Sequence, residues 1–302
     1  MIYTLTFNPS LDYDIYSEKI VSGEVNRVSD TKITFGGKGI NVSAVLNTLG
    51  VPNVALGFAG GFSGKELKRL LDQSKIRNRL IDISPLQTRI NVKLHSLSDT
   101  DINASGPEIE EKHLKTLKNL LSLLKEEDTL CVCGSANGVE SFKEVLSVLK
   151  PEVRLAADCT GEYLKEAVKH KPFLIKPNEF ELNEYFNTDA HGEDELITLA
   201  IKLRSEGAEN VLVSRGEKGL LLVCSKGVYR ADALKGTVLN TVGAGDSAFA
   251  GFLCGFDKTG DEAQALKFAL SCASAAAFSR NLPSFFDMRK YLGLAEIEKL
   301  SN

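Results

Sequence analysis

The sequence lacks the features that mark membrane-spanning, secreted or nucleic-acid-binding proteins. No apolar run reaches the roughly 18 residues that a membrane-spanning helix needs. Residues 1–7 have neither the basic segment nor the apolar core of a secretory signal, so we expect a first strand there and a cytoplasmic protein. The formal net charge of −4 over 302 residues offers no basic face to nucleic acid. These absences leave a water-soluble globular protein, long enough for one large domain with a small appendage.

The sequence also lacks the cysteine spacing of a metal site. Only Cys131 and Cys133 lie close together, with one residue between them, and none of the four histidines is near them. Scattered thiols in apolar runs are typical of small buried residues in a reducing cytosol. We therefore expect neither a zinc site nor a catalytic thiol among the six cysteines, which are Cys131, Cys133, Cys159, Cys224, Cys254 and Cys272.

What the chain does contain is an alternation of apolar runs and segments with helical period. Helices are expected between the strands, for example at residues 110–125 and 194–206, where leucines recur on one face. After Asp261 the chain is expected to be helical, with no further strand. The alternation predicts right-handed βαβ units and a mainly parallel sheet, with ligands beyond the carboxyl ends of the strands. Strands are expected at residues 54–59, 129–133, 154–158, 173–176 and 211–214.

Two polar, strand-like stretches break this alternation, at residues 11–35 and 88–104. In the second, Ile90, Val92 and Leu94 fall on one face of an extended segment and polar side chains on the other. We expect the two stretches to form a small sheet that projects from the main domain. An edge hairpin with a solvated polar face is the alternative.

The most informative stretch is a glycine-rich turn, Asn-Thr-Val-Gly-Ala-Gly-Asp-Ser at residues 240–247, which leads into an apolar helix-like run. Its glycines permit positive φ and close approach of a ligand. The first amides of a helix have no partner within the helix and suit a phosphate. Asp246 would repel that phosphate unless it has a task of its own, such as taking a proton from a group that attacks the phosphate.

A second glycine-rich stretch is Gly-Gly-Lys-Gly-Ile-Asn at residues 36–41, before a predicted helix that a glycine ends. It lacks the spacing of a P-loop. It nevertheless brings backbone amides, the cation of Lys38 and the amide of Asn41 to a helix start. That set suits a polyhydroxyl or phosphorylated ligand, and a plain glycine-rich connector is the alternative.

Together the two stretches resemble the two signatures of the ribokinase-like (PfkB) carbohydrate kinases, in the same order and about 200 residues apart. Between them, Asn178 and Glu181 are similar to the family's Asn-x-x-Glu motif, and Ser-Arg-Gly-Glu-Lys-Gly at residues 214–219 is similar to its nucleotide loop. The resemblance covers nearly the whole chain. It implies a three-layer α/β/α domain, a small β-sheet lid that closes over the sugar, and pairing of two lids in a homodimer. The domain would comprise residues 1–10, 36–87 and 105–302, and the lid residues 11–35 and 88–104.

Within the family, Thr-Arg-Ile-Asn-Val-Lys at residues 88–93 is especially similar to 1-phosphofructokinases. The resemblance implies ATP- and Mg²⁺-dependent phosphorylation of a phosphorylated ketohexose, namely fructose 1-phosphate to fructose 1,6-bisphosphate. Tagatose-6-phosphate kinases and the family's 6-phosphofructokinases are the alternatives. Ala-Asp-Cys-Thr-Gly at residues 157–161 departs from the family's Leu-Asp-Thr-Ser-Gly, as does Phe35 from the usual proline, which leaves the shape of the sugar pocket open.

The resemblance also assigns roles residue by residue. Asp246 is the base that takes the proton of the attacking hydroxyl, and the amides of Gly243, Ala244 and Gly245 face the transferred phosphoryl group. Asn178 and Glu181 organise Mg²⁺ through water. Residues assigned to the sugar phosphate are Asp12, Arg27, Gly37, Lys38, Asn41, Arg89 and Lys93. Residues assigned to the nucleotide are Lys176, Asn178, Ser214, Gly216, Gly219, Ser271 and Ala275.

Several of these residues have simpler interpretations. Asn178 followed three residues later by Glu181 is also the pattern of a helix capping box. Lys93 and Asp14 are also interpretable as solvated strand residues, and His95 is expected to be structural. The turn at residues 243–248 satisfies the loose dinucleotide fingerprint, so an NAD-binding oxidoreductase is a remote alternative, which requires a strand after the helix. A sugar-phosphate sensor without catalysis is the third hypothesis.

Overall fold

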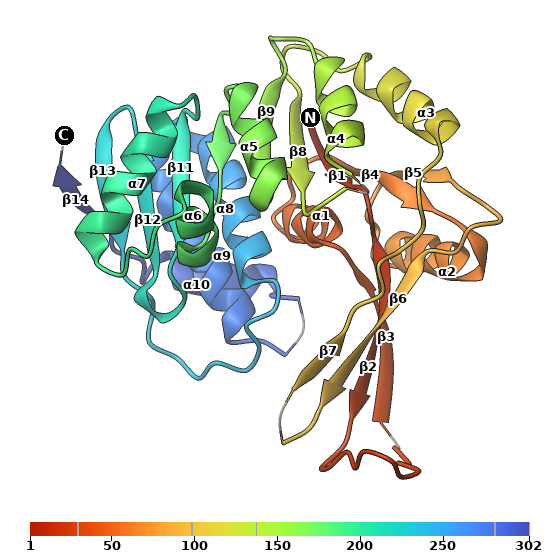
Figure 1. Cartoon of the computed structure of the whole chain (residues 1–302). Coiled ribbons are helices and arrows are strands. Elements are labelled where there is room, and N and C mark those ends of the chain that lie inside the picture. Colours follow the sequence, from red (N-terminus) through yellow and green to blue (C-terminus); the bar gives the residue numbers. More distant parts are fainter. Residues whose placement is uncertain (29, 98, 137, 281, 302) are drawn as a thin grey trace.

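The computed structural model describes residues 1–28, 30–97, 99–136, 138–280 and 282–301, and a ten-stranded sheet dominates it (Figure 1). The strands lie in the order β14-β13-β12-β11-β10-β9-β8-β1-β4-β5. Those from β11 to β5 are parallel, and β12, β13 and β14 form an antiparallel edge. The bounds are β1 (Ile2–Thr6), β4 (Asn53–Ala59), β5 (Asn78–Asp82), β8 (Thr129–Cys133), β9 (Arg154–Asp158), β10 (Leu174–Ile175), β11 (Asn210–Ser214), β12 (Leu220–Cys224), β13 (Gly227–Ala231) and β14 (Glu298–Ser301).

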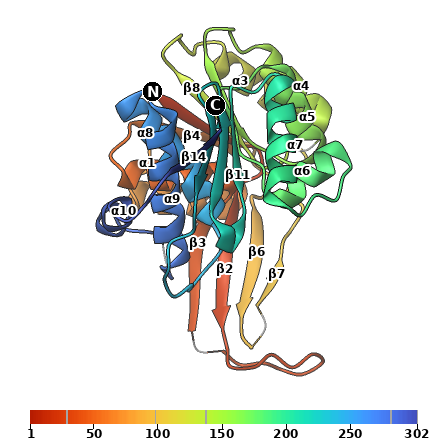
Figure 2. The ribbon, with the colours of Figure 1, turned by 90° about the vertical axis from the view of Figure 1, so that its left-hand side faces the viewer.

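Helices cover both faces of the sheet, which gives three layers (Figure 2). The helices of one face are α3 (Glu111–Leu121), α4 (Val139–Ser147), α5 (Gly161–Lys169), α6 (Glu179–Phe186) and α7 (Glu193–Ser205). Those of the other face are α1 (Lys38–Thr48), α8 (Ala244–Thr259), α9 (Glu262–Ala277) and α10 (Phe285–Leu292), and α2 (Gly61–Gln73) packs beside α1. Their buried residues form one large core on each side, with Leu117 in one and Phe252 in the other, and α2 shares a smaller cluster with α1 that includes Leu67 and Ile40. The predicted three-layer α/β fold is confirmed.

The strand order reverses at β1, which pairs in parallel with both β4 and β8. Such a reversal opens a crevice at the carboxyl ends of the strands, because the connections on its two sides diverge. Residues from both glycine-rich stretches lie at this end of the sheet. The architecture therefore places the candidate site where an open α/β sheet ordinarily binds its ligand.

A second sheet of four strands projects from the main body (Figure 1). Its order is β3-β2-β6-β7, with β2 (Ser10–Tyr16) parallel to β6 (Arg89–His95), and with β3 (Asp30–Gly36) and β7 (Thr100–Ile102) antiparallel at its edges. The polar alternation predicted for residues 88–104 is realised in β6. Residues 29 and 98 of the predicted lid lie outside the described residues.

The C-terminal region differs from the sequence prediction in one strand. The chain after Asp261 does contain a strand, β14, which pairs antiparallel with β13. Its four residues, Glu-Lys-Leu-Ser, are mostly exposed and too polar and short to show strand periodicity. Among the described helices, none is long and apolar enough to cross a membrane.

Candidate active site

The glycine-rich turn at residues 240–247 leads into the N-terminus of α8. Gly243 precedes the helix with a φ of 79°, in the left-handed region that glycine adopts without strain. The amide of Ala244 donates to the carbonyl of Thr241 at 3.3 Å. The turn thus directs the start of a 16-residue helix, with its partial positive charge, toward the crevice.

Asp246 lies in the first turn of α8 and is only 7% exposed. Its Oδ2 accepts a hydrogen bond of 2.8 Å from Nδ2 of Asn41, in the other glycine-rich stretch. Burial and the neighbouring carboxylate of Asp158 raise the pKa of Asp246 to about 6, against the opposing effects of Asn41, Lys38 and Lys176. The structure therefore brings the two signatures, which are 205 residues apart at this bond, into direct contact around a carboxylate that can act as a base near neutral pH.

A buried group of charges lies beside this turn. Asp158, at the end of β9, is fully buried between two ammonium groups: Lys38 Nζ at 3.1 Å from Oδ1 and Lys176 Nζ at 3.3 Å from Oδ2. The two cations outweigh burial and hold the pKa of Asp158 below its usual range. Burial would lower the pKa of Lys38, but the carboxylates of Asp158, Glu181 and Asp246 outweigh burial and raise it. The predicted residues Lys38 and Lys176 thus meet around a third residue that the sequence did not assign to the site.

Gly37 and Asn41 occupy the start of α1 as predicted from the glycine-rich stretch. Gly37 precedes the helix with a φ of 113°, and a Cβ there would come within 2.9 Å of the Thr6 side chain at the end of β1. Only glycine fits that backbone, because both its conformation and its closeness to β1 exclude a side chain. This packing aims the start of α1 at the crevice.

Asn178 and Glu181 form the capping box that was the simpler interpretation of their spacing. Asn178 Oδ1 accepts from the Glu181 amide at 2.8 Å, and Glu181 Oε2 accepts from the Asn178 amide at 2.9 Å. The remaining carboxylate oxygen of Glu181, Oε1, lies 4.0 Å from Lys38 Nζ. In the described part of the chain, no three or more His, Cys, Asp or Glu side chains are grouped to hold a metal ion. A single carboxylate oxygen outside the capping box fits a magnesium ion that keeps its water shell, and it does not fit direct coordination by several protein ligands.

The nucleotide loop predicted at residues 214–219 joins this region directly. Ser214 ends β11, its amide donates to the carbonyl of Pro177 at 3.0 Å, and it forms a parallel bridge with Asn178. The short 3-10 helix η1 (Gly216–Lys218) follows. Gly216 and Gly219 have positive φ values of 56° and 87°, so both glycines are explained by the backbone turn itself. Their contact with a nucleotide stays a prediction.

Ser271 and Ala275 are not brought to the surface of the crevice. They are 2% and 0% exposed, inside the packing of α9, and the Ser271 hydroxyl donates to the carbonyl of Met288 in α10. The helical spacing of the two residues could indicate a shared face but not which neighbour covers it. The Ser271 hydroxyl is thus bound to α10, and contact of either residue with an adenine stays a prediction.

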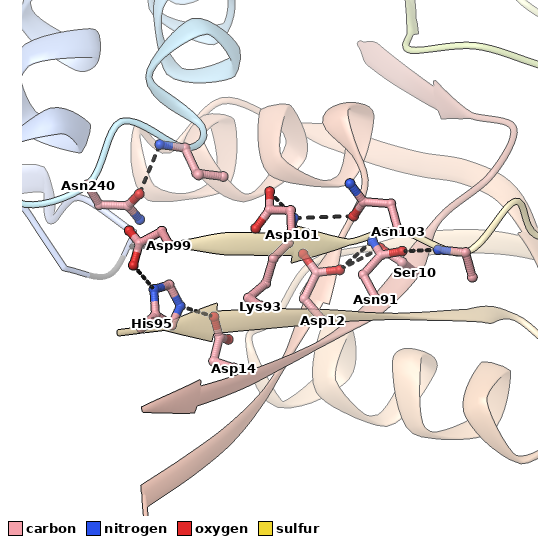
Figure 3. A network of polar contacts seen from close by, with 12 residues as sticks. Ser10, Asp12, Asp14, Asn91, Lys93, His95, Asp99, Asp101, Asn103 and Asn240 are labelled. Atoms are coloured by element: carbon pink, nitrogen blue, oxygen red, sulfur yellow. Dashed lines mark hydrogen bonds and ion pairs between the residues drawn. The ribbon is translucent and has the colours of Figure 1, made fainter. Parts of the chain in front are cut away.

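The small sheet carries a polar network on one face (Figure 3). Asp12 Oδ1 accepts from Ser10 Oγ at 2.8 Å and from Asn91 Nδ2 at 2.9 Å. Lys93 Nζ contacts Asp101 Oδ2 at 2.7 Å and Asn103 Oδ1 at 3.3 Å. Sequence reasoning found Asp12 and Lys93 and missed these partners, although the alternation of β6 placed Asn91 on the polar face.

The two predicted arginines differ in their surroundings. Arg89 donates from Nε to the carbonyl of Asn8 at 3.2 Å and from Nη1 to that of Ala104 at 3.0 Å, so it joins the segment before β2 to the segment after β7. Burial lowers the pKa of Arg89 against the attraction of Asp12. Arg27 is exposed in the β2–β3 connection. A phosphate contact for either residue stays a prediction.

The histidine expected to be structural has polar partners on the same face. His95 Nε2 lies 2.9 Å from Asp14 Oδ1, and its ring stacks on Tyr16 with centroids 4.6 Å apart. The Asp14 and His95 side chains point toward one another from β2 and β6 (Figure 3). All six cysteines, by contrast, are buried and free, as predicted.

The dinucleotide alternative does not fit the observed connectivity. In the described residues, α8 leads directly into a second helix, α9, and not into the strand that a βαβ unit requires. The two helices pack along each other as a pair. The glycine-rich turn therefore belongs to a helix start followed by a second helix, which is not the βαβ unit of a dinucleotide-binding oxidoreductase.

Comparison with known proteins agrees with this site. A 1-phosphofructokinase from Borreliella burgdorferi is 38% identical over 305 residues, which cover 99% of each chain. A D-tagatose-1-phosphate kinase from Bacillus licheniformis is 34% identical, covering 93% of this chain and 94% of that one. The crystal structure of phosphofructokinase-2 from Escherichia coli in complex with fructose-6-phosphate superposes with a TM-score of 0.91 at 25% identity, over 97% and 98% of the two chains.

Residues 7–284, which include both glycine-rich stretches and the Asn-x-x-Glu motif, match the family described as pfkB family carbohydrate kinase. The family predicted from the two glycine-rich stretches is thereby confirmed. The chain belongs to the pfkB family of carbohydrate kinases.

Proposed function

We propose that the protein transfers the terminal phosphoryl group of ATP to fructose 1-phosphate and forms fructose 1,6-bisphosphate. The observation that carries the proposal is Asp246, a buried carboxylate held by Asn41 at the start of α8. The Borreliella relative named 1-phosphofructokinase supports the choice of acceptor. A tagatose phosphate is the second candidate, since another relative is named D-tagatose-1-phosphate kinase. The sequence alone had suggested tagatose 6-phosphate for that place.

Asp246 would take the proton of the attacking sugar hydroxyl. Its pKa of about 6 leaves the carboxylate ionised at neutral pH, yet basic enough to accept a proton as the new O–P bond forms. Nδ2 of Asn41 donates to Asp246 Oδ2 and so fixes the orientation of the carboxylate, with Oδ1 left to accept the proton. The side chain is thus oriented before the substrate arrives.

The turn and Lys176 would stabilise the charge on the transferred phosphoryl group. A Cβ placed on Gly245 would lie 3.3 Å from Lys176 Nζ, so the ammonium group lies against the turn. Phosphoryl transfer depends on positioning and on charge stabilisation more than on covalent participation of the protein. Helix amides on one side and a fixed cation on the other supply both.

Magnesium, when bound with ATP, would neutralise phosphate oxygens and orient them for in-line transfer. Oε1 of Glu181, the oxygen outside the capping box, is the protein atom that would bind the water shell of the magnesium ion. The Asn178 side chain would hold the backbone of this loop in place through the capping box. Sugar kinases of this family use ATP.

The small sheet would act as the lid of the sugar site. Asp12 would accept hydrogen bonds from sugar hydroxyls, and Lys93, with Arg27, Lys38 and Arg89 as further candidates, would meet the phosphate already on the sugar. Closure of such a lid excludes water and limits hydrolysis of ATP. The lid, its boundaries at residues 11–35 and 88–104, and a cytoplasmic location stay predictions.

The small sheet would also pair with that of a second copy. Its face opposite Asp12 carries an apolar row that crosses all four strands, Ile33-Tyr13-Val92-Ile102, in direct register. Ile33 and Ile102 are 46% and 56% exposed. Exposed apolar rows of this kind are typical of protein interfaces. We therefore propose a homodimer formed through the lids.

The decisive test is an ADP-release assay with purified protein, ATP and Mg²⁺ over a panel of acceptors. The panel contains fructose 1-phosphate, fructose 6-phosphate, tagatose 1-phosphate, tagatose 6-phosphate and unphosphorylated fructose. We expect the highest kcat/KM with fructose 1-phosphate. A higher kcat/KM with either tagatose phosphate would make that sugar the acceptor in place of fructose 1-phosphate. If no acceptor of the panel causes ADP release, the proposed function is wrong.

A further inference from the structure

The residue that the mechanism above does not use is Asp158, a buried carboxylate at the centre of the charged group. It is 0% exposed at the end of β9, where the sheet meets the crevice. Its two partners come from distant parts of the chain, Lys38 from the start of α1 and Lys176 from just after β10. Burying a charge so completely is unfavourable unless its partners are well placed, so the arrangement calls for a reason.

We propose that Asp158 is a positioning residue for phosphoryl transfer, whose carboxylate fixes the ammonium group of Lys176 against the Ala244–Gly245 turn. The inference rests on the proposed kinase function and deepens it. Asp158 would not touch the substrate. It would act through Lys176, which lies between Asp158 and the turn.

The geometry gives Lys176 one anchored position. Lys176 is 5% exposed, its Nζ lies 3.3 Å from Asp158 Oδ2, and the same atom would lie 3.3 Å from a Cβ on Gly245. The ammonium group of a lysine is carried on a flexible four-carbon chain, which loses much rotamer freedom when the group is fixed. Because Asp158 already fixes the ammonium group of Lys176, this entropy is lost on folding and not during phosphoryl transfer.

Lys38 holds the carboxylate itself in place. Its Nζ donates to Asp158 Oδ1 at 3.1 Å, which leaves Oδ2 turned to Lys176. Oδ2 has an ion pair with Lys176 and no hydrogen bond of good geometry, so the contact is a charge contact that depends on distance. The two lysines would repel each other without the carboxylate between them. Loss of Asp158 is therefore expected to let Lys176 move away from the turn.

The proposed role differs from that of a carboxylate that only stabilises the fold. A purely structural Asp158 would change the melting temperature and leave turnover alone. A positioning Asp158 changes kcat at saturating ATP and sugar phosphate, because the cation is out of place in the transition state. The KM for the sugar phosphate should change less than kcat, since Lys38 alone among the residues assigned to the sugar phosphate has an ion pair with Asp158 in the described part of the chain.

Asp128 offers a matched control, because it is also a buried carboxylate beside a strand of the sheet. It precedes β8, is 9% exposed, accepts from the Lys125 amide at 2.9 Å and lies 3.3 Å from the N-terminal ammonium group. None of these partners belongs to the candidate site. Asp128→Asn should therefore lower the melting temperature and leave kcat unchanged.

The experiment compares Asp158→Asn, Lys176→Met and the double variant with the wild type, using the acceptor that the wild type phosphorylates best. We expect kcat of Asp158→Asn to fall about 100-fold, the effect of a group misplaced by about 1 Å. The double variant should have the kcat of Lys176→Met alone, because the carboxylate then has no cation to position. Unchanged kcat in Asp158→Asn, or losses that multiply in the double variant, would overturn the proposal.

A second comparison applies if Asp158→Asn does not fold by itself. The double variant removes one buried charge of each sign, so it leaves no unpaired lysine at that position. Its kcat is then compared directly with that of Lys176→Met, and a further fall of about tenfold or more contradicts positioning through Lys176. The wild-type activity in the same assay decides the proposed function separately, whatever the variants show.

Discussion

Asp246 combines two properties that oppose each other in one residue. The mechanism needs a carboxylate that is basic, and the structure makes it basic by burial and by the nearby charge of Asp158. Both effects disfavour the ionised form in the folded protein. In the proposed mechanism Asp246 therefore increases activity and decreases stability, and substitution separates the two effects.

We predict that Asp246→Asn lowers kcat by about 10²- to 10⁴-fold, since it removes a general base and keeps the shape of the side chain. The same change should raise the melting temperature. A pKa raised from 3.8 to about 6 corresponds to roughly 3 kcal/mol of destabilisation at neutral pH as an upper bound. The folded state binds this proton more tightly, so the difference in stability between variant and wild type should be small near pH 4, grow between about pH 4 and pH 6, and level off at higher pH. Turnover near the wild-type value, with the sugar still bound, would remove Asp246 as the base.

The pH dependence of activity tests the same residue without removing it. Because the base must be ionised, kcat/KM should be constant above neutral pH and fall tenfold per unit below about pH 6. The second ionisation of a phosphate ester also occurs near pH 6 and could imitate this limb. Asn41→Leu separates the two, since loss of its hydrogen bond should move an Asp246 limb to higher pH and leave a substrate limb in place. A limb that does not move in this variant would assign it to the substrate.

Residues of the site were predictable in proportion to how local their constraints are. The positive φ of Gly243, Gly216 and Gly219 follows from turns whose glycines the sequence displays. The capping box of Asn178 and Glu181 is likewise a property of four consecutive residues. Asp158 was visible only as part of a variant motif, because its meaning depends on two lysines brought to it by the whole fold.

At the scale of elements, the small sheet shows what alternation predicts and what it leaves open. The alternation in β6 indicates which residues share a face, but it does not indicate the register with β2, β3 and β7. The observed register aligns a second row across the sheet, Lys32-Asp14-Lys93-Asp101, with charges that alternate in sign. Cross-strand pairs of opposite charge stabilise a sheet, so this row has a structural reason as well as a functional one.

Asp101 on β7 therefore forms an ion pair with Lys93, the ammonium group that is proposed to bind the substrate phosphate. Its carboxylate lies 2.7 Å from Lys93 Nζ and is 48% exposed, so the pair is partly screened by water. We predict that Asp101→Asn lowers the KM for fructose 1-phosphate by about two- to fivefold, because the phosphate no longer competes with or faces that carboxylate. The KM for unphosphorylated fructose should not change, and kinetics on both acceptors give the answer.

The control for this prediction is Asp99→Asn, which changes an exposed carboxylate in the connection between β6 and β7 that lies 3.7 Å from His95 Nδ1. It should leave both KM values as they are. If Asp101→Asn instead raises the KM for the phosphorylated sugar, Asp101 orients Lys93 for the substrate and does not compete with it.

At the scale of the whole molecule, the fold was predictable where the chain alternates strongly and less so at its edges. The parallel strands β4, β8, β9 and β11 and the helices α3 and α7 follow from long apolar runs and leucine periodicity. The strand β14 was missed, because an edge strand of four polar residues is specified by its partner β13 and not by its own sequence. The burial of Ser271 under α10 was missed for a similar reason, since packing between two separate helices leaves no local pattern in the sequence.

The apolar row of the small sheet makes the molecule's assembly testable. A single copy leaves Ile33 and Ile102 46% and 56% exposed on a face that carries Tyr13 and Val92 between them. Burial of each such side chain against a second lid contributes about 1.5–3 kcal/mol, whereas a carboxylate at the same position has to be desolvated. The double variant Ile33→Glu/Ile102→Glu should therefore be a monomer under conditions where the wild type is a dimer, as measured by sedimentation or light scattering. Ile201→Glu, which changes a 48% exposed isoleucine on α7 far along the chain from the lid, should remain dimeric.

If the lid is completed by its partner, the monomeric variant should also lose affinity for the sugar phosphate more than for ATP, because Asp12 and Lys93 belong to the same sheet. A wild type that is monomeric at all concentrations would contradict the lid dimer, and so would a double variant that stays dimeric.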